Sequence, residues 1–435
     1  MVLVYCERSS PRLQYAIDLV LNTMLGLEFQ LIHDQETFRQ AGVPRICYGR
    51  QPVSKKEVFI EADGLLFEKG LKPFEPATAE LKGLKVLFPS KSRLCQAGFD
   101  IFSAAFFLVS RYEEYLPHLK DRFGRYEPSQ SLAFRHGFLQ QPVVDQYAMH
   151  LKGLLKSRFG KFTFPERRFR HMPTIDVDVA YAYKGRGFLR TVYGVWKSLL
   201  HGDVASVRER VMVLLGKEKD PFDTFEEQLA LHRRYGLKAW YFFLCGDYGE
   251  LDRNIAYHSP AFQKLVMKVA DYAHVGIHPS AASNGRSSRL TEEVKRLSSL
   301  IKSPVTYSRQ HYLMLSLPGT YQALIALDIA YDFSMGYAPQ PGFRAGTCTP
   351  FLFYDLTREA VTSLRVIPLA VMDGTLKDYL RLSPEEGMDY ISRLIHEVKL
   401  VNGTFVSLWH NDAFSDKGAW AGWKEVYEAM LRMTS

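Results

Sequence analysis

The pattern of hydrophobic and polar residues from about residue 172 onward alternates between short apolar runs and longer amphipathic segments. Short runs rich in β-branched and aromatic side chains are typical of strands, and apolar residues at three- and four-residue spacing are typical of helices. The predicted strands are 172–178, 238–244, 275–278, 304–307, 331–334, 366–370 and 403–409. The predicted helices are 223–235, 262–273, 292–301, 320–327 and 384–399. This alternation predicts an α/β fold with a parallel sheet or barrel.

The first 165 residues have a less regular pattern. An apolar strand at the start is followed by an amphipathic helix over 11–25 and by strand-like runs at 57–61 and 85–88. The segment 99–116 has apolar residues at helical spacing and a charged end, which predicts a buried helix. We therefore predict an additional N-terminal α+β domain over 1–165 and a β/α domain over 166–435. Because no repeat or low-complexity linker separates them, we expect a substantial interface between the two.

Composition places the chain among ordinary globular proteins. It has 435 residues, of which 47% are hydrophobic, and a formal net charge of +8. Basic and acidic residues are interspersed, which permits weak attraction to anionic glycans, lipids or nucleic acid but indicates no nucleic-acid partner. The five cysteines are scattered without C-x-x-C spacing, which fits a reducing compartment. No segment reaches the ~18 apolar residues that a membrane span needs, so we expect a cytoplasmic protein.

The most informative motif is Thr174-Ile175-Asp176-Val177-Asp178 at the end of a predicted strand. Side chains alternate between the two faces of a strand, so Asp176 and Asp178 should point the same way. Two carboxylates side by side on one face of a strand repel each other. Their closeness is costly unless a cation lies between them, or unless one carboxylate binds a metal while the other takes a proton. A strand end whose carboxylates cap the next helix or reach solvent is the alternative interpretation.

Three further polar signals lie where predicted strands end and loops begin. They are His278-Pro279-Ser280, Arg344-Ala345-Gly346 and His410-Asn411. In parallel β/α folds the functional groups gather at these ends. Carboxylate oxygens and imidazole nitrogens suit zinc or another divalent transition metal with open positions for water and substrate. Together with the aspartate pair, these signals predict a metal-assisted hydrolase.

The order of these segments resembles the polysaccharide deacetylase (NodB-homology) family of carbohydrate esterases over roughly residues 172–420. The resemblance implies an irregular (β/α) barrel in which Asp176 is the base and Asp178 a metal ligand. Gly276-Ile277-His278 is similar to the start of the family's second motif, which makes His278 a metal ligand. Phe343-Arg344-Ala345-Gly346 resembles the arginine motif and implies that Arg344 pairs with Asp176. Ser407-Leu408-Trp409-His410 resembles the final motif, whose histidine is the general acid, and Asp373 stands where an aspartate would tune that histidine.

The chain departs from the family at the second metal histidine, because the residue four after His278 is Ala282. We expect His311, in the stretch Ser308-Arg309-Gln310-His311-Tyr312, to replace it as the third ligand. Arg309 and His311 would share a face of that strand-like run. His274 is the competing candidate, but it occupies the start of a strand and is better explained as structural.

The resemblance implies deacetylation of an N-acetyl or O-acetyl group on a sugar or glycan precursor. The implied cofactor is a divalent metal, zinc in the first place, with cobalt, nickel or manganese as alternatives. Two other functions stay open. One is an inactive deacetylase-like protein that binds glycans or acts as a scaffold, which the missing histidine favours. The other is a metal-dependent hydrolase of a different amide, because β/α scaffolds host many chemistries.

Overall fold

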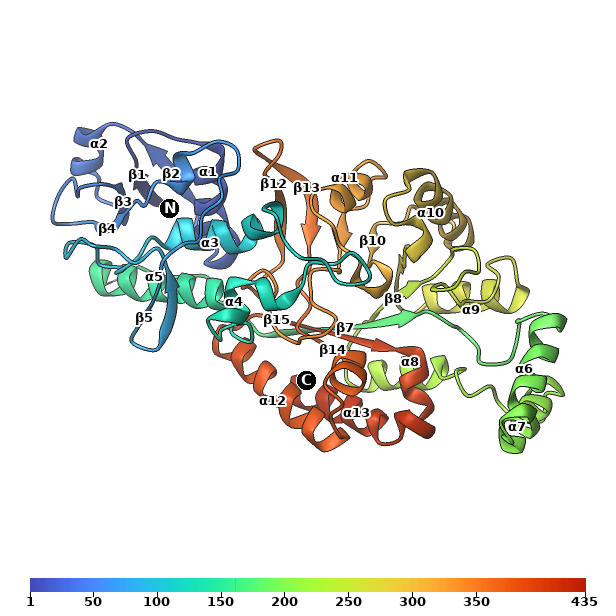
Figure 1. The fold of residues 1–435 in the computed structure, drawn as a ribbon. Helices are drawn as coiled ribbons and strands as arrows, with labels where there is room; N and C mark the ends of the chain where they lie inside the picture. Colours follow the sequence, from blue (N-terminus) through green and yellow to red (C-terminus); the bar gives the residue numbers. More distant parts are fainter. Residues whose placement is uncertain (161) are drawn as a thin grey trace.

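The computed structural model describes residues 1–160 and 162–435, and in this part of the chain the largest element is a nine-stranded sheet (Figure 1). The strand order is β12-β13-β11-β10-β9-β8-β7-β15-β14, and the β12–β13 hairpin is antiparallel whereas the other neighbours are parallel. The strands are β7 (Arg170–Val177), β8 (Trp240–Phe243), β9 (His274–Ile277), β10 (Tyr307–Ser308), β11 (Tyr331–Asp332), β12 (Phe351–Asp355), β13 (Ala360–Val366), β14 (Val371–Met372) and β15 (Thr404–His410).

Helices connect these strands, as the alternating pattern predicts. In Figure 1, α8, α12 and α13 lie below β7 and β15. The helix α12 begins with a capping box, in which Ser383 and Glu386 bond each other's backbone N–H, and with Pro384 in its first turn. The helices are α6 (Phe188–Leu200), α7 (Val204–Leu214), α8 (Phe225–Arg234), α9 (Pro260–Ala270), α10 (Ser287–Ile301), α11 (Gly319–Ile325), α12 (Pro384–Leu400) and α13 (Trp423–Thr434).

The predicted α/β class with parallel strands is confirmed. Among the described residues no hydrogen-bonded ladder joins the outer strands β12 and β14, so closure into a barrel stays a prediction. The predicted strand 366–370 was wrong in its position, because β13 ends at Val366 and β14 begins at Val371. Pro368 lies between them, and proline has no N–H to donate to a ladder.

The N-terminal region contains a second, parallel sheet with the order β2-β1-β3-β4. Its strands are β1 (Val2–Tyr5), β2 (Phe29–Ile32), β3 (Arg45–Gly49) and β4 (Val58–Glu61), and an antiparallel hairpin of β5 (Thr78–Leu81) and β6 (Leu84–Leu87) follows. The helices are α1 (Pro11–Ile17), α2 (Gln35–Gln40), α3 (Ile101–Val109), α4 (Leu132–Arg135) and α5 (Val143–Phe159). The predicted helix 11–25 is α1 continued by a π-helical segment over Asp18–Met24.

The predicted buried helix 99–116 is shorter than expected. All nine residues of α3 are buried, and Asp100 caps the helix by accepting the N–H of Ser103. The helix ends because Arg111 adopts a left-handed backbone conformation with φ of 54°. This turn directs the Arg111 and Glu114 side chains into the interior, where they form an ion pair.

One continuous hydrophobic core joins the N-terminal sheet, α3 and α5 to the nine-stranded sheet. Polar contacts also cross between the two regions: the Tyr15 hydroxyl donates to the carbonyl of Leu352 at 2.7 Å, and Arg12 pairs with Glu359. The predicted domain limits, 1–165 and 166–435, stay predictions. No helix in the described part of the chain has the length and apolar character needed to cross a membrane.

Candidate metal centre

The carboxyl ends of β7, β9, β10 and β15 meet at one edge of the sheet. The parallel register places Asp176 opposite His410, and Phe243 of β8 opposite both Val177 and Ile277. Residues that directly follow these strands must therefore lie close together. Asp178 follows β7 and His278 follows β9, while His311 begins a 3₁₀ turn three residues after β10.

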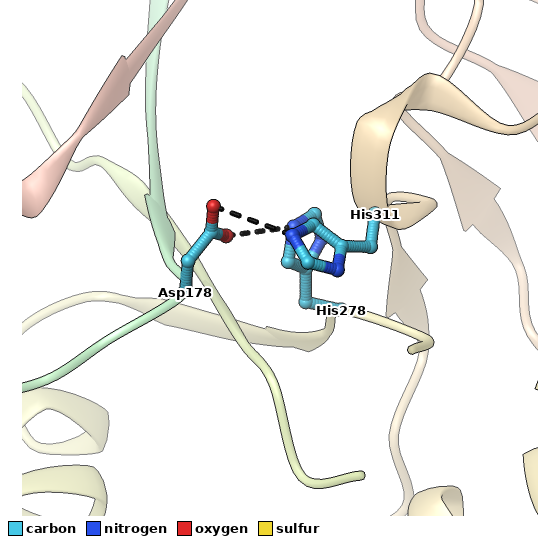
Figure 2. A group of neighbouring side chains, drawn as sticks. All are labelled: Asp178, His278 and His311. Carbon is cyan, nitrogen blue, oxygen red and sulfur yellow. Dashed lines mark ion pairs between the residues drawn. The ribbon is translucent and has the colours of Figure 1, made fainter. Parts of the chain in front are cut away.

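Figure 2 shows Asp178, His278 and His311 facing one another at this edge. His278 Nε2 lies 3.1 Å from Asp178 Oδ1, and His311 Nε2 lies 3.4 Å from Asp178 Oδ2. One potential ligand atom from each of the three residues lies within 4.8 Å of the other two. The carboxylate and the two imidazoles therefore converge on a single point, as ligands of one cation do.

Hydrogen bonds on the outer side of each imidazole fix its orientation. His278 Nδ1 lies 2.6 Å from the carbonyl oxygen of Arg309, and His311 Nδ1 lies 2.8 Å from Asp252 Oδ1. Because a carbonyl or carboxylate oxygen can only accept, both Nδ1 atoms carry the proton. In the neutral imidazoles the lone pair of Nε2 then points toward Asp178, which is the arrangement found in metal-bound histidines.

The electrostatics of the three residues also suit a cation. Burial by itself lowers the pKa of His311, but the charges of Asp178 and Asp252 raise it to about 9. Burial raises the pKa of Asp178, and contacts with His311 and His278 outweigh it and hold that pKa well below its usual range. With the His278 proton on Nδ1, Asp178 Oδ1 accepts no hydrogen bond from any described residue, although His278 Nε2 lies 3.1 Å away. This oxygen is therefore free to bind a divalent metal, and the donor set fits zinc or a similar ion.

Asp176 lies beside this centre and is held by Arg309. Asp176 Oδ2 lies 3.8 Å from His278 Nε2, whereas Arg309 Nη1 lies 3.3 Å from Asp176 Oδ1 and donates to Thr174 Oγ1 at 2.7 Å. The Arg309 guanidinium is fully buried and packs over the ring of Phe242. The arginine thus contacts one oxygen of Asp176 and leaves the other facing the metal centre.

The predicted pairing of Arg344 with Asp176 was wrong. Arg344 Nε and Nη2 bond Glu114 at 2.8 and 2.6 Å, and Arg344 Nη1 donates to the carbonyl of Gly336. Arg344 is buried in the interface with the N-terminal region, and its charge is neutralised there. Arg309, which directly follows β10, contacts Asp176 instead.

His410 and Asp373 form a second polar pair at the same edge. His410 Nδ1 lies 2.7 Å from Asp373 Oδ1, and the backbone N–H of His410 donates to Asp373 Oδ2 at 2.7 Å. The other ring nitrogen, Nε2, lies 3.8 Å from Asp178 Oδ2. Burial lowers the pKa of His410, but the charge and hydrogen bond of Asp373 raise it well above its usual value. His410 can therefore hold a proton on the nitrogen that faces the centre.

A cavity of about 440 Å³ opens onto these residues, a size typical of small-molecule sites. Its wall includes Tyr312, Tyr379, Leu408 and Met372, and it also includes Arg122 and Arg125 from the N-terminal region. Arg125 is buried and donates to the carbonyl of Tyr312 at 2.7 Å. The sequence motifs all lie after residue 172, so they did not indicate that earlier residues line the site.

Asp252 and Arg309 contact the residues of the centre, and the motifs indicated neither contact. Asp252 lies in the loop after β8 and also accepts the backbone N–H groups of Ala281 and Ala282. The backbone of Ala282, where the resemblance would place a histidine, thus contacts Asp252 beside the centre. His274 stacks on Trp240 at the start of β9, with ring centroids 4.6 Å apart, which agrees with the structural role expected for it.

A family model described as "Family of unknown function (DUF7033)" matches residues 2–160. No curated protein matches the chain. Among solved structures, one named as a polysaccharide deacetylase from Mycobacterium smegmatis is similar with a TM-score of 0.40 and 12% identity, covering 62% of this chain and 87% of that chain. Another so named, from Pseudomonas aeruginosa, has a TM-score of 0.38 and 10% identity, covering 61% and 85%. A CE4 family pseudoenzyme from Bacillus anthracis has a TM-score of 0.30 and 9% identity, covering 61% and 62%.

Proposed function

We propose that this protein is a metal-dependent deacetylase that removes an acetyl group from a sugar or glycan precursor. The observation that carries the proposal is the convergence of Asp178, His278 and His311 within 4.8 Å, with Asp176 on one side and His410 on the other. A metal-binding carboxylate beside a second carboxylate and an acid histidine is the set of groups that acyl hydrolysis requires. The sequence motifs that resemble the polysaccharide deacetylases point to the same reaction.

Asp178, His278 and His311 would hold the metal. A divalent metal bound there, zinc in the first place with cobalt, nickel or manganese as alternatives, supplies Lewis acidity that polarises an acyl carbonyl and lowers the pKa of water toward about 7. The residues around the centre supply orientation. Asp252 fixes the ring of His311, and the carbonyl of Arg309 fixes the ring of His278.

Asp176 and His410 would move the protons. Asp176 accepts the proton of the attacking water at Oδ2, because Oδ1 is engaged by Arg309. His410 donates a proton from Nε2 to the departing nitrogen or oxygen as the bond to the acetyl carbon breaks. Arg309 and Asp373 are positioning residues in this scheme, since they act through Asp176 and His410.

The test is metal content together with acetate release. Purified wild type should contain one zinc per chain and release acetate from N-acetylglucosamine oligomers. His311→Ala should lose both properties because it removes one of three ligands. His274→Ala is the matched control, a histidine in the same sheet that lies outside the centre, and should retain both.

Four results would contradict the proposal. Wild type that binds no metal would remove the basis for the metal centre. His311→Ala that still contains one zinc per chain would do the same. Wild type that binds metal and glycan without releasing acetate would support the binding-protein alternative. Release of ammonia or another amine from non-sugar amides, without acetate release from sugars, would support the other hydrolase.

A further inference from the structure

Two helices, α6 and α7, form a hairpin in the connection between β7 and α8, and they stand apart from the rest of the molecule in Figure 1. The base of the hairpin is fixed. The Asp220 carboxylate is buried and accepts the backbone N–H groups of Ala182, Tyr183 and Lys184 at 2.8 to 3.1 Å. The hairpin therefore leaves the body from a defined point, a few residues after the metal-ligand candidate Asp178.

The outer face of α6 is a continuous exposed apolar surface. None of its residues is buried, and Leu189 is 82% exposed while Trp196 is 55% exposed. At 100° per residue, the large exposed apolar side chains of α6 fall within an arc of about 140°. They are Phe188, Leu189, Val192, Tyr193, Trp196, Leu199 and Leu200.

The opposite side of α6 is used for packing on α7. Gly194 lies against the Arg210 guanidinium of α7, and Arg210 Nη1 lies 3.4 Å from the carbonyl of Thr191. The apolar arc is therefore not the face that holds the hairpin together. Further exposed apolar residues, Val204, Val211, Leu214 and Leu215, lie on α7 and at its end. Half of the exposed large hydrophobic side chains in the described part of the chain lie within residues 188–215.

The hairpin is also strongly basic. Residues 184–219 contain eight Lys and Arg residues against three Asp and Glu residues, which accounts for most of the net charge of +8. On the helical wheel, Lys197 and Arg190 lie about 40° and about 60° beyond one edge of the apolar arc of α6. Lys197, Arg208, Lys217 and Lys219 are exposed and form no ion pair with any described residue. The charge is thus available to an external partner.

We propose that the α6–α7 hairpin docks the protein onto an anionic lipid surface. A helix with a wide apolar arc, flanking cations and exposed tyrosine and tryptophan lies in the interface between headgroups and acyl chains. Basic residues beside such a helix are attracted to anionic headgroups. A second copy of this chain fits less well, because two such hairpins would bring together surfaces of the same positive charge. The proposal is independent of the proposed hydrolase activity.

The experiment is flotation of the full chain with vesicles. We expect wild type to float with vesicles of mixed phosphatidylcholine and phosphatidylglycerol and to float several-fold less with phosphatidylcholine alone. Raising the salt from about 0.1 M to about 1 M, which shortens the screening length from about 10 Å to about 3 Å, should weaken binding. Leu200→Glu should reduce binding about tenfold or more, since it places a carboxylate in the apolar arc.

Leu400→Glu is the matched control, because Leu400 is a similarly exposed leucine on α12, and it should bind like wild type. Lys197→Gln with Arg208→Gln changes only the charge and should weaken binding to the anionic vesicles alone. Circular dichroism and the melting temperature establish that each variant is folded. The proposal is overturned if wild type does not float with the anionic vesicles or if Leu200→Glu floats equally well. It is also overturned if wild type is a dimer that Leu200→Glu converts to a monomer, because a second copy would then cover the apolar face.

Discussion

Arg309 Nη1 lies 3.3 Å from Asp176 Oδ1, so the arginine that holds this carboxylate comes from the segment that also supplies the ligand candidate His311. The carbonyl of the same arginine accepts from His278. One short segment after β10 thus contacts the proposed base, orients the ring of His278 and contains His311. The positions of the proposed proton acceptor and of the proposed metal ligands therefore depend on the same segment.

Arg309→Lys should lower kcat while leaving the zinc content at one per chain, because no ligand is removed. Displacement of Asp176 by about 1 Å is enough to cost roughly 100-fold in rate. Acetate release and metal analysis on the same sample measure the two effects. Arg344→Lys is the control, because Arg344 bonds Glu114 and not Asp176. This variant should lower the stability of the fold without changing the activity of each folded molecule. Equal loss of activity in both variants would contradict the assignment.

Asp252→Asn should weaken zinc binding by about 10–100-fold, the usual effect of removing an outer-shell partner of a metal-binding histidine. Asp252 is buried and its Oδ1 accepts from His311 Nδ1, so the variant loses the charge that orients the imidazole. Competition with a zinc chelator measures the affinity. Asp247→Asn, an exposed aspartate of the same loop, should bind zinc like wild type. If Asp252→Asn binds zinc with the affinity of wild type, Asp252 does not support the metal centre.

Asp373→Asn should reduce kcat by about 10²–10⁴-fold, close to the effect of His410→Ala, and should leave zinc content unchanged. The buried carboxylate accepts from both the ring and the backbone of His410, and general acid catalysis contributes a factor of this size. Because the two residues act as one unit, the double variant should be little worse than either single variant. Multiplicative losses in the double variant would show that they act separately. Steady-state kinetics on the three variants decides between these outcomes.

Glu114 should make the fold sensitive to acid. Burial raises the pKa of Glu114, but the charges and hydrogen bonds of Arg344 and Arg111 lower it by more. The net result is a pKa of about 2, compared with an ordinary value of 4.5. Because the pKa is lower in the folded state, the carboxylate contributes stability above pH 4.5, and this contribution is lost as the pH falls from about 4.5 toward about 2. Urea unfolding at a series of pH values in this window measures the effect.

Glu114→Gln should lose about 3–5 kcal/mol at neutral pH, because two buried arginines are left without their carboxylate. Its stability should then vary less between pH 4.5 and pH 2 than that of wild type. Glu7→Gln, at an exposed position, should follow the wild-type curve. A wild-type curve that is flat over this window would contradict the low pKa of Glu114.

Periodicity predicted most of the elements that build the centre, but β10 is Tyr307–Ser308 and overlaps the predicted strand 304–307 at one residue only. The strands β7, β8, β9 and β15 and the helices α8, α9 and α12 lie within a few residues of their predicted limits. Each has an apolar run or an amphipathic face that identifies it. The helices α6, α7 and α13 and the strand β12 were not predicted. The apolar residues of α6 do have helical spacing, so this helix could have been predicted from the sequence although none of its residues is buried.

The sequence by itself determined which side chains stand at strand ends: Asp176, Asp178, His278 and His410 follow apolar runs whose limits are local. It also gave His311 as a candidate ligand, and the structure brings its Nε2 to 3.4 Å from Asp178. Only the tertiary structure decided which arginine contacts Asp176: Arg309 directly follows β10 and reaches Asp176, whereas Arg344 lies in a loop and bonds Glu114. The support from Asp252 and the contribution of Arg122 and Arg125 to the cavity were decided in the same way. Such contacts join residues tens to hundreds of positions apart, and their pairing is set by packing, which has no local signal in the chain.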